Sequence, residues 1–247
     1  FFNIVKKIKS KNFDQSYIYS DSIRLFLISK FSGINKIYHY KFFSKKKKNF
    51  YKTAKYFSEE TLGVPVDHES KIFLNKSEIE ESKKKYAISD QTKNIICGIS
   101  ASGPTKRWEI KNYIKLFIKL SEKFQCKFFI AAGPKDENLV KEIMNSPLKN
   151  KCIVFTNMTI AETIPIIGAC KYYIGNDTGW GHICSGFNLK SLFLFCDSPP
   201  KAYASYANNI SIVLPDGESI ESCGHNTRGK DKISFDKVLN ESLKLLN

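Results

Sequence analysis

The sequence predicts an α/β fold of two Rossmann-like domains with parallel sheets, of which the N-terminal one is incomplete. Three observations support this prediction. Strand-like and helical runs alternate from residue 94 onward, residues 1–62 show a shorter series of the same kind, and residues 171–182 run from a strand through a glycine-bearing turn into a helix. The 247 residues, 42% of them apolar, can bury a substantial core in one large domain or two small ones.

The C-terminal domain, residues 76–247, has the more regular alternation. Its predicted strands cover residues 94–100, 127–133, 152–156, 171–175, 191–196 and 210–214. The clearest helix covers residues 109–124, where apolar residues recur at three- and four-residue steps from Ile110 to Phe124. This order of elements is typical of a doubly wound parallel sheet.

The N-terminal domain, residues 1–75, begins with a basic helix. A strand over 15–20, a helix over 22–31, a strand over 36–40 and a basic segment follow. Such a short series cannot form a parallel sheet covered on both faces, so we expect the N-terminal portion of this domain to be missing. We interpret residues 63 to about 90 as the linker between the domains, starting with the turn at 63–67.

Positive charge is concentrated in the first 60 residues, which carry 14 Lys or Arg against 4 Asp or Glu, a net charge of +10 out of +15. Four lysines at 45–48 are flanked by Phe42, Phe43, Phe50 and Tyr51. Such a cluster could lie on an anionic bilayer, approach a phosphorylated glycolipid or contact nucleic acid, or it could be a solvated helix face.

Composition also limits the compartment. No run of about 18 apolar residues occurs, and the lysine-rich N-terminus lacks the layout of a signal peptide. The seven cysteines form no C-x-x-C pair, and most lie in apolar surroundings that favour reduced core thiols. We therefore expect a cytoplasmic protein.

Residues 174–182, with the sequence Ile-Gly-Asn-Asp-Thr-Gly-Trp-Gly-His, predict an anion site. The first N–H groups of a helix have no intrahelical partners and lie at the positive end of the helix dipole, so a diphosphate can bind there. Glycines at 179 and 181 keep side chains away from that position. Asp177 could cap the helix or accept hydrogen bonds from ligand hydroxyls.

Three loops that follow strands carry the polar chemistry. Ligands of open α/β sheets bind beyond the carboxyl ends of the strands, so these loops are expected to act together. They supply hydroxyls at Ser102 and Thr105, a cation at Lys106, and carboxylates at Glu137 and Asp177. This set suits a nucleotide diphosphate. A P-loop is excluded because no Gly-Lys-Ser/Thr closes the first loop.

These motifs resemble those of glycosyltransferase family 9, the ADP-heptose:lipopolysaccharide heptosyltransferases. The family signature Asp-x-Gly-x-x-His is matched by Asp177, Gly179 and His182, and three further segments resemble the family at 106–108, 133–137 and 157–159. The resemblance implies a GT-B fold and no cofactor, with an ADP-sugar as the donor substrate. No Asp-x-Asp is present in the sequence, and no metal site is expected.

The resemblance also implies residue roles. Lys106 and Asp177 would be the catalytic groups, with Lys106 on the leaving diphosphate and Asp177 on sugar hydroxyls. The nucleotide-sugar contacts would be Ser102, Thr105, Lys106, Glu137, Met158, Asp177, Thr178, Gly179 and His182, with His182 either reaching phosphate or supporting the loop. Arg24 would bind the acceptor. The family's N-terminal Asp base has no counterpart in the sequence, and Asp21 is a weak substitute.

The resemblance therefore implies an inverting, metal-independent glycosyltransferase that moves heptose or a related sugar from an ADP-sugar to a lipopolysaccharide inner-core acceptor. Its partners would be ADP-heptose or a similar nucleotide sugar, the core acceptor and an anionic inner-membrane surface, and no nucleic acid. The alternatives are a non-catalytic module that binds a nucleotide sugar or docks on an anionic membrane, and a nucleotide-sugar epimerase of GT-B type.

Overall fold

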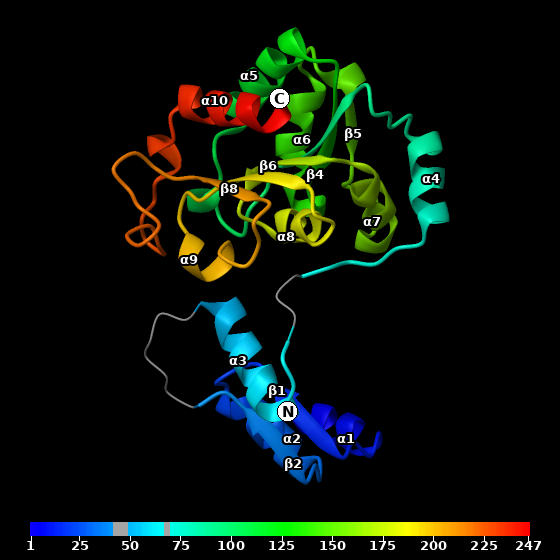
Figure 1. Cartoon of the computed structure of the whole chain (residues 1–247), viewed down its shortest axis with the longest axis vertical. Helices are drawn as coiled ribbons and strands as arrows, with labels where there is room; N and C mark the ends of the chain where they lie inside the picture. The colour runs from blue at the N-terminus through cyan, green and yellow to red at the C-terminus, as the bar shows by residue number, and fades with distance from the viewer. Residues whose placement is uncertain (42–48, 67–69) are drawn as a thin grey trace. The chain divides into compact units, whose positions relative to one another are not determined.

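The computed structural model describes residues 1–41, 49–66 and 70–247, and the chain divides into two compact units, Phe1–His68 and Glu69–Asn247 (Figure 1). The four lysines at 45–48, with Phe42 and Phe43, lie outside the described residues.

The N-terminal unit contains two parallel strands. Its described elements are α1 (Phe2–Lys9), β1 (Gln15–Ile18), α2 (Ile23–Phe31), β2 (Lys36–His39) and α3 (Phe50–Leu62). Gln15 pairs with Lys36, and the register continues to Ile18 and His39. The predicted strand–helix–strand order is confirmed. Asn49 is the N-cap of α3 and its side chain accepts a hydrogen bond from the Lys52 N–H, and Gly63, in the left-handed region, is the C-cap.

The C-terminal unit is built on six parallel strands. They are β3 (Lys93–Gly98), β4 (Cys126–Ala131), β5 (Cys152–Val154), β6 (Tyr172–Asn176), β7 (Lys190–Leu194) and β8 (Ile210–Val213). Their order in the sheet is β5-β4-β3-β6-β7-β8. The chain therefore moves outward from β3 to one edge, returns to β6 beside β3 and continues to the other edge, as in a doubly wound Rossmann sheet.

Helices cover both faces of this sheet (Figure 1). The helices of this unit are α4 (Lys76–Lys85), α5 (Ile110–Lys123), α6 (Glu137–Met144), α7 (Ile160–Ala169), α8 (Gly179–Gly186), α9 (Pro200–Tyr203) and α10 (Phe235–Leu246). One core cluster joins the sheet to α5, α6 and α10, and a second joins it to α7 and α8. The apolar stripe predicted for 109–124 is buried, with Tyr113, Leu116, Phe117 and Leu120 in the core.

The expectation that residues 63 to about 90 form a linker is wrong for α4. A capping box starts this helix, in which the Asn75 N–H donates to Glu78 Oε2 at 3.2 Å. The helix packs against α7, and the preceding Ile72 N–H donates to the Gly186 carbonyl at 2.9 Å. Residues 72–85 therefore belong to the C-terminal unit.

The two central strands, β3 and β6, approach each other closely where they end. Gly98 pairs with Gly175, and a Cβ added to Gly175 would lie 2.6 Å from the Gly98 backbone. The strand order of the sheet reverses between β3 and β6, so the loops after these two strands run to opposite sides. The crevice between the two loops is where folds of this kind bind ligands.

Candidate functional site

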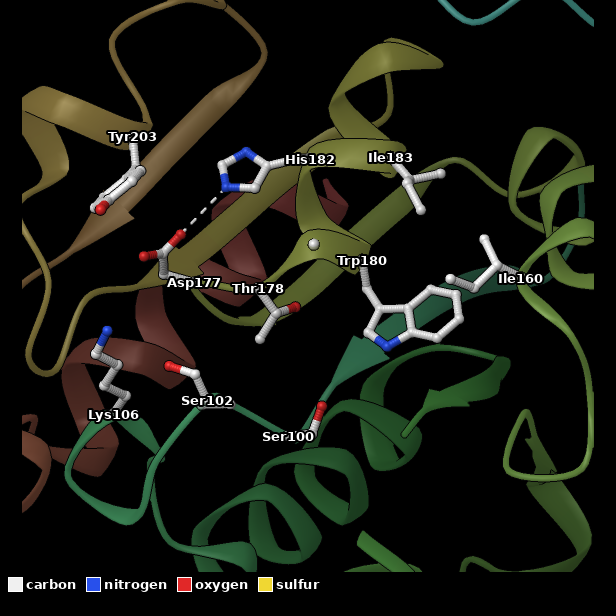
Figure 2. A pocket seen from close by; sticks show the side chains of 12 residues that line it. Ser100, Ser102, Lys106, Ile160, Asp177, Thr178, Trp180, His182, Ile183 and Tyr203 are labelled. Atoms are coloured by element: carbon white, nitrogen blue, oxygen red, sulfur yellow. Dashed lines mark ion pairs between the residues drawn. The ribbon is translucent and has the colours of Figure 1, made fainter. Parts of the chain in front are cut away.

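A cavity of about 490 Å³ opens at the carboxyl ends of β3 and β6 (Figure 2). The loops after these strands and helix α8 supply most of its wall, with single residues from α7 and α9. Its lining residues are Ser100, Ala101, Ser102, Lys106, Ile160, Asp177, Thr178, Gly179, Trp180, His182, Ile183 and Tyr203. Six of the nine residues predicted from the motifs thus share one cavity.

The start of α8 lies open at this cavity. Thr178 occupies the N-cap position but makes no side-chain cap hydrogen bond, and its hydroxyl lies 3.3 Å from the Tyr173 hydroxyl. No atom lies within 4 Å of a Cβ built on Gly179. The first N–H groups of the helix, at Gly179 and Trp180, have no intrahelical acceptor. An anion can therefore approach the positive end of the helix without meeting a side chain.

Lys106 supplies a cation to the same cavity. It ends a short 3₁₀ turn, Pro104–Lys106, in the loop after β3. In the part of the chain that the structure describes, no carboxylate lies within ion-pair distance of its ammonium group. Figure 2 shows Lys106, Ser102 and Asp177 toward one end of the cavity and Trp180 and Ile160 toward the other. The cavity is thus charged at one end and apolar at the other.

The fully buried side chain of Asn176 fixes the loop that carries Lys106. Its amide nitrogen donates to the carbonyls of Ile99 and Ser100 at 3.1 and 3.2 Å, and its oxygen accepts from the Trp108 N–H at 3.0 Å. The Trp108 indole is 1% exposed and donates to the Ile233 carbonyl at 3.0 Å. Both ends of loop 99–108 are therefore anchored to the core.

The Asp177 carboxylate is held by two side chains. Ser198 donates to Oδ2 at 2.7 Å, and His182 Nε2 lies 3.3 Å from Oδ1. His182 Nδ1 lies 2.7 Å from the Tyr206 hydroxyl. The neutral tautomer with its proton on Nε2 satisfies both contacts, because Nε2–H donates to Asp177 and Nδ1 accepts from Tyr206. Thr178, and not Asp177, occupies the N-cap position of α8.

Thr105 directly precedes Lys106 but does not line the cavity. Its hydroxyl donates to Asp197 Oδ2 at 2.7 Å, and the Arg228 N–H donates to Oδ1 at 2.8 Å. Burial opposes ionisation of Asp197, but these hydrogen bonds and the positive charge of Lys106 outweigh it and lower the pKa of the carboxyl.

Glu137 and Met158 do not line this cavity either. Glu137 begins α6, is exposed and pairs with Lys141 at 3.2 Å. Met158 follows β5 and lines a second cavity of about 400 Å³, whose other walls come from α4 and α7. Glu137 lies after β4 and Met158 after β5, so both lie beyond the carboxyl ends of strands of the six-stranded sheet.

The sequence reasoning missed several residues of this site: Trp180, Ile183, Ile160, Tyr203, Ser198 and Tyr206. A signal was present for two of them. Trp180 lies inside the glycine-bearing turn, and Ser198 follows β7, where a polar residue is expected to face the same edge as Asp177. Tyr206 is contributed from beyond α9, and no pattern in the sequence marks it.

Arg24 and Asp21 lie in the N-terminal unit. Both side chains are exposed, with Asp21 just before α2 and Arg24 in its first turn. A cavity of about 850 Å³ in this unit is lined by residues of β2 and α3 and by neither Arg24 nor Asp21.

No helix among the described residues is long and apolar enough to cross a membrane. The described side chains also include no group of three or more His, Cys, Asp or Glu that could hold a metal ion.

Comparison with known proteins agrees with this geometry. The sequence profile of glycosyltransferase family 9 (heptosyltransferase) matches residues 1–233. The chain belongs to this family. A lipooligosaccharide heptosyltransferase 2 of Campylobacter jejuni is 28% identical over 99 residues, which span 38% of this chain and 30% of that relative.

Solved structures show the fold of this family 9 chain. An E. coli ADP-heptose lipopolysaccharide heptosyltransferase II superimposes with a TM-score of 0.76 at 18% identity, covering 98% of this chain and 79% of the other. A family 9 glycosyltransferase from Veillonella parvula gives a TM-score of 0.77 at 18% identity, covering 99% and 77%. E. coli heptosyltransferase WaaC with ADP gives 0.70 at 12% identity, covering 98% and 75%. The expected GT-B fold is confirmed.

Proposed function

We propose that this family 9 chain binds an ADP-sugar and transfers its heptose, or a related sugar, to a lipopolysaccharide inner-core acceptor. The observation that carries the proposal is one cavity whose lining includes Lys106, the open start of α8 and the carboxylate of Asp177, which other side chains hold in place. Cation and helix start suit a diphosphate, and the carboxylate suits sugar hydroxyls. Two of the similar solved structures, of other proteins, are described as bound to ADP and to ADP-2-deoxy-2-fluoro heptose.

In the proposed reaction, an acceptor hydroxyl oxygen bonds to the anomeric carbon while the bond from that carbon to the β-phosphate oxygen breaks. The departing ADP takes the electron pair, and attack from the opposite side inverts the anomeric configuration. Negative charge then grows on the diphosphate next to Lys106 and the N–H groups of Gly179 and Trp180. These groups are proposed to fill the role that a divalent metal has in other transferases.

The acceptor proton must go to a base. The one carboxylate among the described residues that line the cavity is Asp177, which already accepts hydrogen bonds from Ser198 and His182. We propose Asp21, the candidate that the sequence offers, as this base. Arg24 and the net charge of +10 on the first 60 residues favour contact with acidic groups of the lipid and with an anionic inner membrane at its cytoplasmic face.

Lys106→Ala tests the donor site. We expect the variant to bind ADP more weakly by about 2 to 4 kcal/mol, because a charged donor to the diphosphate is lost, while its melting temperature stays the same. Isothermal titration calorimetry with ADP measures this. Lys111→Ala is the matched control, since Lys111 is an exposed lysine of α5 that does not line the cavity. Equal ADP affinity of the parent and Lys106→Ala would remove Lys106 from the site.

A further inference from the structure

The two tryptophans of the chain have opposite environments. Trp108 is 1% exposed, and its indole N–H donates to the Ile233 carbonyl. Trp180 is half-buried and lines the cavity, and no acceptor within the described residues pairs with its indole N–H. Phe155, 1% exposed, supports the Trp180 ring at a centroid distance of 5.9 Å. The indole of Trp180 is thus held in place and still presents surface and a donor to the cavity (Figure 2).

Ile160 extends this apolar surface. It is the first residue of α7, it lines the cavity, and its side chain is 61% exposed. A capping box fixes the backbone around it, because the Thr159 N–H donates to Glu162 and the Glu162 N–H donates to the Thr159 hydroxyl. The Ile160 side chain buries little of its apolar surface against the rest of the protein, so that surface is available to a ligand.

We propose that Trp180 determines the base specificity of the donor site: its indole, together with Ile160, forms the wall against which a purine base packs. The inference rests on the proposed function, because it takes the diphosphate to lie at the start of α8. Trp180 directly follows Gly179 in that first turn, so a nucleoside joined to the diphosphate has the indole next to it.

The charged end of the cavity does not suit the nucleoside. Lys106, Asp177 and His182 lie at that end, where the Asp177 carboxylate can accept hydrogen bonds from sugar hydroxyls (Figure 2). A purine has two fused rings and a pyrimidine has one, so a purine covers more of a wall made from a bicyclic indole and an isoleucine. The donor site therefore prefers a purine, because a purine removes more apolar area from water.

The test compares the affinities of ADP, UDP and inorganic pyrophosphate. Trp180→Ala should weaken ADP binding about 10-fold, as expected for the loss of one aromatic–base stack. It should weaken UDP binding less and leave pyrophosphate binding unchanged, so the preference for ADP over UDP shrinks. Trp180→Phe should restore most of the ADP affinity. Ile160→Ala should shift the same ratio in the same direction, and Ile220→Ala, an exposed isoleucine that does not line the cavity, should change nothing.

Fluorescence gives a second measurement on the same variants. ADP should change the emission of the parent, and the change should vanish in Trp180→Phe, where Trp108 remains as an internal control. An unchanged ADP-to-UDP ratio in Trp180→Ala, or an equal loss for ADP and pyrophosphate, would overturn the inference while the proposed function stands. If the parent binds neither ADP nor pyrophosphate, the proposed function and the inference fall together. Should Trp180→Ala not fold, Ile160→Ala and Trp180→Phe decide the question.

Discussion

Asp177 is oriented by side chains that lie outside the signature motif as well as within it. Ser198 follows β7, and Tyr206 acts through His182, so three separate segments fix one carboxylate. A carboxylate whose two oxygens already accept hydrogen bonds loses little conformational entropy when a ligand hydroxyl adds a further bond. His182 is therefore a positioning residue for Asp177, and it also lines the cavity.

Asp177→Asn tests this arrangement. The amide oxygen can still accept from Ser198, but the negative charge that binds sugar hydroxyls is lost. We expect the affinity for an ADP-sugar to fall by about 1.5 to 3 kcal/mol and the affinity for ADP to fall less. Calorimetry with both ligands measures the difference, and Asp216→Asn, an exposed carboxylate paired with Lys237, is the control. A parallel fall in both affinities would contradict a role in sugar binding.

At the residue scale, sequence reasoning predicted that polar residues near the motif lie together, and it missed what distant segments add. The shared cavity of Lys106, Asp177 and Gly179 was predictable because each lies in a loop that follows a strand of the central pair or begins a helix. Tyr206 and the contact of Thr105 with Asp197 were not predictable, because they depend on how loops far apart in the chain pack. No local pattern encodes such contacts.

At the scale of the element, two glycines of helix α8 have different roles. Gly181 allows close packing of the helix, and Gly179 leaves the start of the helix open. A Cβ on Gly181 would meet the rings of Phe193 and Tyr173 at less than 3 Å, whereas a Cβ on Gly179 would project into open space. We expect Gly181→Ala to lower the free energy of unfolding by about 1 to 3 kcal/mol through overpacking. Gly179→Ala should keep stability and weaken ADP binding, because its methyl group enters the anion site.

Thermal unfolding and ADP calorimetry on both variants measure these effects. The pair serves as its own control, since both substitutions are made within one turn of the same helix. Undiminished ADP binding by Gly179→Ala would show that the diphosphate does not approach the start of α8.

Elements of the C-terminal unit were predictable to different degrees. The six strands match the sequence prediction to within two residues at each end, because strands buried on both faces form continuous apolar runs. Helix α4 was taken for linker because its ten residues include one apolar side chain, Ile79, and therefore show no 3.6-residue period. Its helical state depends on its capping box and on packing against α7.

At the scale of the whole molecule, buried thiols predict how stability depends on pH. Burial raises the pKa of Cys126 to about 11 and that of Cys196 to about 12. In the unfolded chain these thiols ionise near pH 8.5, so above that pH the unfolded state loses protons that the folded state keeps. The free energy of unfolding should therefore be unaffected below about pH 8 and should fall by up to about 1.4 kcal/mol per pH unit for each such thiol above it.

Urea unfolding at a series of pH values from neutral to alkaline measures this fall. Cys196→Ala should be less stable at neutral pH, because it leaves a small cavity, yet it should show a shallower alkaline slope than the parent. An identical slope in both proteins would assign the pH dependence to other groups.

Asp21→Asn tests the proposed base. The one carboxylate of the described cavity lining, Asp177, already accepts hydrogen bonds from protein side chains, and loss of a general base typically slows a reaction by about 10² to 10⁴. We therefore expect Asp21→Asn to slow transfer by about that factor and to leave ADP binding unchanged. A transfer assay with ADP-heptose and purified inner-core lipid measures the rate, and calorimetry measures the ADP affinity. An unchanged transfer rate in Asp21→Asn would remove Asp21 from the reaction.

The contact between Asn176 and the Trp108 backbone has a consequence for dynamics. The Trp108 amide proton is hydrogen-bonded to the side-chain oxygen of Asn176, which is fully buried at the end of β6. This proton can therefore exchange with solvent deuterium only when the structure around Asn176 opens. Loop 99–108 is already anchored without ligand. ADP should therefore slow this exchange only as much as it raises the free energy of global unfolding. The slowest-exchanging amides of the protein should therefore include one that belongs to a loop.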